Sequence, residues 1–242
     1  MVLSMKIKKL VRNIMNKGHI DIIRYQKKQP LLQFLTKYNI KTVFDVGANI
    51  GEFSMYVREV LPTVDIFAFE PQPTCAQHIR SRFSNDTHVH VLEYAVGDKE
   101  ETKEFLLNTY TPSASLLPLT KTHLESFPHA QETKPIAVSV KTLDSIYMQY
   151  EDIIQKPLFL KLDIQGYELP ALAGAEKVLE HSQIVLAEAC FEELYQGQGL
   201  FDDIFHILKQ KGFYYHGSIS TKFDSKTRLP LFEDALFIKN KL

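Results

Sequence analysis

The segment VFDVGANIG, residues 43–51, decides the fold of this chain. It opens with apolar residues around Asp45, which is typical of a buried strand, and Gly47 follows as a turn residue. A second apolar run at residues 65–70 ends in an acid, Glu70, nineteen residues after that segment. Strand, glycine turn, helix start, second strand and terminal acid are the order in which an α/β sheet forms a ligand site at its carboxyl edge.

The glycine spacing narrows the class of ligand. A dinucleotide site uses G-x-G-x-x-G so that the backbone can approach a pyrophosphate, whereas this turn reads D-x-G-x-x-x-G, with Asp45 in place of the first glycine. A carboxylate there repels a pyrophosphate but suits a ligand with a positive amine or sulfonium, such as S-adenosylmethionine. We therefore expect Asp45, Gly47, Asn49 and Gly51 to bind S-adenosylmethionine. A tight turn without a ligand is the alternative interpretation.

Two further positions fit the same nucleoside ligand. Glu70 ends the second predicted strand, where its carboxylate can accept hydrogen bonds from both ribose hydroxyls. The alternative for Glu70 is an acid at a helix N-terminus. Ala95 lies near the end of a third predicted strand, residues 89–96, from which backbone groups can meet an adenine edge.

The segment KLDIQGYE, residues 161–168, is the second cluster of chemically useful side chains. Lys161 and Asp163 alternate with apolar neighbours, so both point to the same side of a predicted strand at residues 158–163. One interpretation is a structural ion pair with another group, because a buried charge needs a partner. The other makes this a catalytic cluster, in which Asp163 at the mouth of the site accepts a proton from an acceptor hydroxyl.

Glu188 extends this cluster, since it lies near the end of the next predicted strand, residues 184–189, and can face the same mouth. The carboxylates of Asp163 and Glu188 could instead bind one Mg²⁺ ion through oxygen ligands. The residue pattern does not decide whether Asp163 acts as a base or as a metal ligand.

Strands and helices alternate along most of the chain, which favours a mostly parallel sheet covered on both faces. Three of the predicted helices cover residues 50–60, 143–150 and 201–211. Two more are a helix entered through Pro71 and Pro73 and a helix that ends at residue 179. Further strands are predicted at 104–107 and 136–140, and a final antiparallel pair at 213–216 and 235–238. The polar connection at residues 108–135 is predicted to be a substrate-side loop. The nine histidines are scattered and are interpreted as surface or packing residues, and no hydrolase or P-loop motif is present.

Composition and charge limit the possible domain organisation, compartment and partners of the chain. The 242 residues are 45% hydrophobic, carry a net charge of −1 and hold two distant cysteines, which predicts one α/β domain in a reducing, cytoplasmic compartment. Residues 1–41 contain ten Lys or Arg and one acid, so we expect a basic helical extension at 1–40 before a domain at 41–242. This extension is either a solvated helix or a peripheral contact with the inner membrane surface or an anionic, lipid-linked substrate. Nucleic acid is disfavoured because aromatic residues are not interleaved with the basic ones.

The chain resembles the FkbM-type methyltransferases. The segments that carry the resemblance are Phe44–Gly51, Phe69-Glu70-Pro71, Ser113–Leu116, Thr142–Ser145, Leu160–Glu168, Leu172 with Gly174-Ala175, Glu188, and Tyr195–Gln198. The family often has glutamate where Gln165 stands and two serines where this chain has Ala114-Ser115. The resemblance implies a class I methyltransferase (Rossmann-like) α/β fold: a seven-stranded, mostly parallel sheet with helices on both faces and an antiparallel last strand.

The resemblance also implies an activity. We expect S-adenosylmethionine-dependent O-methylation of a hydroxyl on a sugar, glycolipid or secondary metabolite, that is, a small-molecule or carbohydrate acceptor. Asp163, Lys161 and Glu188 are the predicted catalytic residues, and Ser113, Ser115 and Tyr195 the predicted acceptor-side residues. The alternatives are a non-catalytic nucleoside-binding protein on the same fold and an NAD-dependent oxidoreductase.

Overall fold

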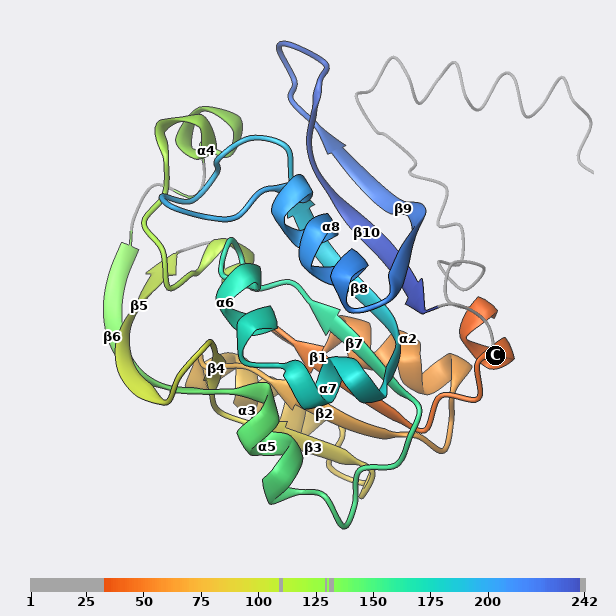
Figure 1. Cartoon of the computed structure of the whole chain (residues 1–242). Helices are drawn as coiled ribbons and strands as arrows, with labels where there is room; N and C mark the ends of the chain where they lie inside the picture. Colours follow the sequence, from red (N-terminus) through yellow and green to blue (C-terminus); the bar gives the residue numbers. More distant parts are fainter. Residues whose placement is uncertain (1–32, 109–110, 129, 131–132, 240–242) are drawn as a thin grey trace, which may run out of the picture.

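The computed structural model describes residues 33–108, 111–128, 130 and 133–239 (Figure 1). The basic helix predicted at residues 5–17 lies outside these residues, as does most of the predicted extension at 1–40. None of the helices in the described part is long and apolar enough to cross a bilayer.

A seven-stranded sheet forms the centre of the fold. Its strands are β1 (Thr42–Val46), β2 (Asp65–Phe69), β3 (Val89–Leu92), β7 (Leu158–Leu162), β8 (Ser182–Cys190), β9 (Phe213–Phe223) and β10 (Pro230–Lys239). They lie in the order β3-β2-β1-β7-β8-β10-β9, and β10 runs antiparallel to both of its neighbours. This arrangement confirms the predicted sheet with its reversed last strand. The strand order changes direction between β1 and β7, which is where open α/β sheets bind ligands.

Alternation along the strands creates two apolar cores, one on each face of the sheet. Phe44, Phe67 and Leu160 belong to the larger core, whereas their neighbours Val43 and Ile66 belong to the smaller one. Successive strand residues point to opposite faces, and every one of these side chains is fully buried. The near-continuous apolar runs of the central strands are therefore explained by burial on both faces.

Helices cover both faces. They are η2 (Gln33–Lys37), α2 (Glu52–Val60), α3 (Pro73–Arg82), α5 (Leu143–Gln149), α6 (Glu168–Ala173), α7 (Glu176–His181) and α8 (Phe201–Gln210). Leu35 of η2 and Val57 of α2 pack into the smaller core, while α5, α7 and α8 contribute Leu143, Val178 and Leu208 to the larger one. The helix predicted through residue 179 is wrong as one helix, because Gly174 ends α6 where the chain approaches the Gly97 carbonyl oxygen; a Cβ at Gly174 would lie 2.3 Å from that atom.

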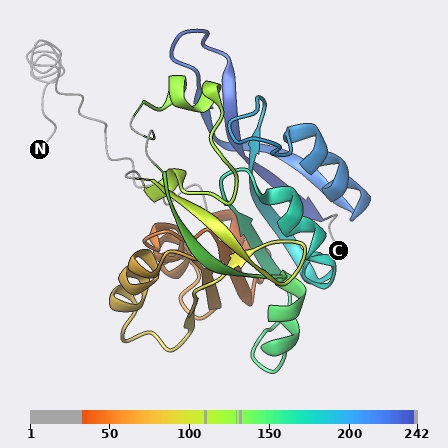
Figure 2. The same ribbon diagram turned by 90° about the vertical axis from the view of Figure 1, so that its left-hand side faces the viewer.

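The strand predicted at residues 89–96 is also wrong as a single strand, because the chain changes sheets within it. β3 pairs with β2, whereas β4 (Ala95–Val96) joins β5 (Glu101–Asn108) and β6 (Thr133–Lys141) in a second sheet of order β4-β6-β5. Figure 2 shows this second sheet facing the viewer. The connection between β5 and β6, predicted to be a loop, contains η3 (Thr111–Ser113) and α4 (Lys121–Ser126).

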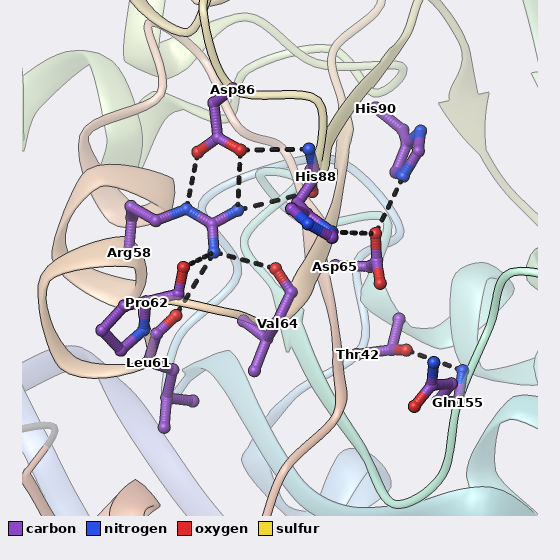
Figure 3. A network of polar contacts seen from close by, with 10 residues as sticks. All are labelled: Thr42, Arg58, Leu61, Pro62, Val64, Asp65, Asp86, His88, His90 and Gln155. Atoms are coloured by element: carbon purple, nitrogen blue, oxygen red, sulfur yellow. Dashed lines mark hydrogen bonds and ion pairs between the residues drawn. The ribbon is translucent and has the colours of Figure 1, made fainter.

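A polar network ties together the opposite, amino edge of the main sheet (Figure 3). Arg58 of α2 donates to the Asp86 carboxylate at 2.7 Å and to the backbone carbonyl of Val64 at 2.9 Å. His88 and His90 both contact the Asp65 carboxylate, at 3.1 and 3.2 Å. These two histidines therefore stabilise the strand ends away from the β1–β7 switch point.

Candidate active site

The turn after β1 contains three residues with positive φ angles, a backbone conformation that residues other than glycine rarely adopt. Gly47, Asn49 and Gly51 all have positive φ angles, of 77°, 48° and 79°. A Cβ on Gly47 would lie 1.8 Å from the Asp163 carbonyl oxygen, so this glycine is needed for β1 and β7 to approach at their carboxyl ends. Gly51 is the N-cap residue of α2.

Glu70 is held at the end of β2 by two backbone donors. Its Oε2 accepts a hydrogen bond from the Asn49 N–H at 2.8 Å, and its Oε1 accepts one from the Gln72 N–H at 2.8 Å. The side chain is almost fully buried, and burial raises the pKa of Glu70 to about 7 against the opposing effect of these two N–H donors. The two bonds fix the carboxylate at the wall of the cavity described below.

Asp45 and Lys161 form an ion pair beneath the turn. Asp45 is fully buried, its Oδ2 accepts from the Ser54 hydroxyl at 2.6 Å, and its Oδ1 lies 3.2 Å from Lys161 Nζ. Lys161 also donates to the Gly47 carbonyl at 2.9 Å. Burial lowers the pKa of Lys161, but the Asp45 and Asp163 carboxylates more than offset this and hold the pKa above its usual value. The pair thus joins β1, β7 and the turn, and contact of Asp45 with a ligand stays a prediction.

Three polar side chains converge on Gln165, just beyond β7. Its amide Nε2 donates to Asp163 Oδ1 at 2.7 Å and to Glu188 Oε2 at 3.1 Å, and its Oε1 accepts from the Tyr195 hydroxyl at 2.6 Å. Gln165 holds this position with a left-handed backbone, at φ 58°, and its carbonyl accepts from the Ser115 hydroxyl at 2.6 Å. The predicted partners Asp163 and Glu188 are therefore brought together through a residue that the motif analysis did not assign to the site.

Burial and the neighbouring acidic groups change the pKa values of two side chains in this cluster, Glu188 and Tyr195. Burial, and then the negative charges of Asp163, Glu168 and Asp234, raise the pKa of Glu188 well above its usual range. This shift favours protonation of Glu188, and a protonated carboxyl group is also a hydrogen-bond donor. Burial and the nearby carboxylates raise the pKa of Tyr195, which keeps its hydroxyl protonated and donating to Gln165.

A cavity of about 320 Å³ connects these groups. Of the predicted site residues, its walls include Gly47, Asn49, Glu70, Ala95, Ser113, Asp163, Glu188 and Tyr195. The other four predicted residues lie behind the walls: Asp45, Gly51, Ser115 and Lys161. The size falls within the range of small-molecule sites, and the cavity runs across the carboxyl ends of β1, β2, β7 and β8.

His123 is a cavity residue that the sequence did not single out. It was expected to be a surface or packing residue, but the structure places it on the cavity wall, in edge contact with the Tyr195 ring at 4.9 Å between centroids. It is 3% exposed, neither ring nitrogen has a hydrogen-bond partner among the described residues, and burial lowers its pKa to about 4. No spacing pattern links residue 123 to the strand ends, so only the fold reveals this position.

The predicted Mg²⁺ site receives no support from this geometry. Within the described ranges, no group of three His, Cys, Asp or Glu side chains is arranged to hold a metal ion. Asp163 and Glu188 instead face the amide of Gln165, which donates a hydrogen bond to each carboxylate.

The sheet order, with its reversed last strand and a cavity at the β1–β7 switch point, is that of the class I methyltransferase fold. Residues 45–215 match the methyltransferase FkbM domain, and the chain belongs to this family, as the resemblance in the sequence predicts. Membership confirms the predicted enzyme class, the S-adenosylmethionine-dependent methyltransferases.

Among curated relatives, the 2-O-methyltransferase NoeI of Sinorhizobium fredii is 25% identical over 162 residues, which span 64% of this chain and 66% of NoeI. The methyltransferase sdnD of Sordaria araneosa is 28% identical over 195 residues, 71% of this chain and 73% of sdnD. A solved structure from Streptococcus mutans in complex with SAH aligns over 89% of this chain and 99% of that chain, with a TM-score of 0.46 and 12% identity.

Proposed function

We propose that the protein transfers the methyl group of S-adenosylmethionine to a hydroxyl oxygen of a sugar, glycolipid or secondary metabolite. One observation carries this proposal: a single cavity has the fixed Glu70 carboxylate on one wall and the linked Asp163 and Glu188 on another. The first suits a ribose and the second suits an acceptor hydroxyl. The relative NoeI, named a 2-O-methyltransferase, supports oxygen as the accepting atom.

The residues around Glu70 fit S-adenosylmethionine. Each oxygen of a carboxylate has two acceptor positions, and one on each Glu70 oxygen is used by a backbone N–H. The Gln72 side chain also hydrogen-bonds to this carboxylate, so two ribose hydroxyls would take the position that remains and the one that Gln72 occupies. Gly47 and Asn49 line the same end of the cavity, and Ala95 lies on the wall contributed by the second sheet.

Asp163 is the proposed base. Its Oδ1 is occupied by Gln165, while its Oδ2 lies 3.6 Å from Lys161 Nζ, and the side chain is 38% exposed. Bound S-adenosylmethionine supplies a methyl carbon made electrophilic by its sulfonium. Asp163 Oδ2 would accept the proton of the acceptor hydroxyl as that oxygen bonds to the methyl carbon, while the carbon–sulfur bond breaks and S-adenosylhomocysteine leaves. Alignment of the two reactants and proton transfer to a positioned base each raise the reaction rate by a factor of about 10² or more.

Glu188, Tyr195 and His123 are proposed to orient the acceptor. Glu188 and Tyr195 are both hydrogen-bonded to Gln165, so they present fixed polar groups beside the proposed base. His123 adds two ring nitrogens, unpaired within the part of the chain that the structure describes, that could pair with an acceptor hydroxyl. Ser113 lines the same region.

The test is a methyl-transfer assay with the purified protein, S-adenosylmethionine and a panel of sugars, glycolipids and phenolic or polyketide alcohols. We expect S-adenosylhomocysteine to form only with a hydroxyl acceptor, and NMR of the product to show a methyl ether. Methyl transfer to nitrogen or carbon would overturn the choice of oxygen. Tight binding of S-adenosylhomocysteine without turnover of any hydroxyl compound would favour the non-catalytic alternative, and a thermal shift with NAD alone would favour the oxidoreductase.

A further inference from the structure

The β9–β10 hairpin carries a pair of exposed apolar side chains at its tip. Phe223 ends β9 and is 53% exposed, and Leu229, just before β10, is 58% exposed. The N–H of Asp224 donates to the Leu229 carbonyl at 2.9 Å and Phe223 pairs with Pro230, so both exposed side chains lie at the closed end of the hairpin. Figures 1 and 2 both show this hairpin projecting beyond the body of the protein.

Helix α4 lies beside the tip and makes polar contacts with it. The Ser126 hydroxyl donates to the Asp224 carboxylate at 3.4 Å, and Lys226 lies 3.6 Å from Glu125. We call Phe223 and Leu229 the tip patch.

The tip patch is flanked by basic side chains. The hairpin between residues 222 and 229 holds Lys222, Lys226 and Arg228 but one acid, Asp224. Asp224 is engaged inside the turn, where its Oδ1 accepts from the Lys226 N–H at 2.9 Å and from the next N–H along the chain at 2.6 Å. Apolar side chains at a tip with basic residues behind them are the combination that binds an anionic membrane surface.

The tip patch is continuous with the mouth of the cavity. Lys222 of β9, Phe127 after α4 and Phe232 of β10 line the cavity wall, and Lys222 Nζ lies 5.6 Å from the centroid of the Phe127 ring. An external surface that contacts the tip patch would therefore face the side of the protein that carries this cavity wall.

We infer that the tip patch docks the protein on an anionic lipid membrane, with Phe223 and Leu229 inserted among the lipid headgroups and Lys226 and Arg228 facing anionic phosphates. This inference goes beyond the proposed function, because docking requires neither S-adenosylmethionine nor an acceptor. Its consequence is that an acceptor held at the membrane would enter the cavity from the docked side.

The test measures sedimentation of the full chain with vesicles in the absence of any methyl acceptor. The vesicles are phosphatidylcholine alone or phosphatidylcholine with phosphatidylglycerol, and the variants are Phe223→Ser/Leu229→Ser and Lys226→Gln/Arg228→Gln. We expect the wild-type protein to bind the anionic vesicles, each double variant to bind them roughly tenfold more weakly, and added salt to weaken wild-type binding.

Met148→Ser is the matched control, because Met148 of α5 is 56% exposed but lies outside the tip patch and the cavity lining. This variant should bind like the wild type. All variants should keep wild-type affinity for S-adenosylhomocysteine, which shows that they are folded.

Three results would overturn the inference: no wild-type binding to anionic vesicles, equal binding by wild type and the Phe223→Ser/Leu229→Ser variant, or equal loss in Met148→Ser. A change from dimer to monomer in the Phe223→Ser/Leu229→Ser variant, with unchanged vesicle binding, would instead identify the tip patch as a surface between copies of this chain.

Discussion

Lys161 reaches Asp45 across two neighbouring strands, with Nζ 3.2 Å from Oδ1 and both side chains buried. The pair lies beneath the turn after β1, and Lys161 also donates to the carbonyl of Gly47 in that turn. A buried charge that loses its partner costs about 3–5 kcal/mol, because the remaining charge stays desolvated. The pair therefore has a consequence for folding that can be separated from catalysis.

We expect Lys161→Met to lower the free energy of unfolding by about 3–5 kcal/mol in urea titrations, since it leaves the Asp45 carboxylate buried without its cation. Asp45→Asn in the same chain should recover part of that loss. The control is Lys141→Met, because Lys141 pairs with Glu100 at 2.8 Å on the surface and should contribute about 1 kcal/mol or less. If Lys161→Met costs no more than this control, the ion pair does not stabilise the fold.

Glu70 predicts a pH dependence of ligand binding. Burial raises its pKa from 4.5 to about 7, so the folded protein prefers the protonated acid and this group lowers the free energy of unfolding as pH rises from 4.5 to 7. Ribose hydroxyls donate best to the ionised carboxylate. We therefore expect S-adenosylhomocysteine affinity, measured by calorimetry, to increase by about tenfold between about pH 6 and pH 8.

Glu70→Gln should remove this pH dependence, and Glu70→Ala should weaken binding by about tenfold or more, because two hydrogen bonds to a charged group are lost. Glu93→Gln is the matched control, since Glu93 is an exposed acid that pairs with Arg80 after β3. A steep pH dependence that persists in Glu70→Gln would assign it to Glu168 or Glu188, whose pKa values are also raised.

Asp163→Asn tests the proposed base. The amide keeps the size of the side chain but cannot accept the acceptor proton, so kcat should fall at least about tenfold, equivalent to ~1.4 kcal/mol of barrier. Affinity for S-adenosylhomocysteine should stay unchanged. Single-turnover kinetics decide the outcome, and the exposed Asp202→Asn on α8 is the control. An unchanged single-turnover rate would remove Asp163 from the chemistry.

The main sheet could be predicted because its signals are local. Each central strand is a short, nearly continuous apolar run, and the turn residues from Gly47 to Gly51 follow β1 directly. The second sheet could be predicted only in part: the strands predicted at residues 104–107 and 136–140 are present as β5 and β6, but residues 89–96 read as one strand. Only pairing of Ala95 with Val140, far along the chain, moves β4 into another sheet.

The candidate site was predictable where a residue sits at a strand end and not where it acts through distant partners. Glu70, Asp163 and Glu188 follow from strand ends, whereas Gln165 stands out in the sequence only as a position where the family often has glutamate. Its role depends on a left-handed backbone at φ 58° and on Tyr195, thirty residues away. When side chains from distant segments meet in this way, the sequence shows no characteristic spacing between them.

Gln165→Glu tests whether the shared amide keeps Asp163 and Glu188 together. The change replaces the donor of both hydrogen bonds with a third carboxylate, so near pH 8 the free energy of unfolding should fall by about 1–3 kcal/mol. Near pH 5 the gap from wild type should narrow, because neighbouring acids raise the pKa of the new carboxyl and its protonated form again supplies a donor. Urea titrations at both pH values measure this, with the exposed Gln196→Glu as control. A loss that is the same at both pH values, or equal to that of the control, would mean that the amide does not hold the two carboxylates together.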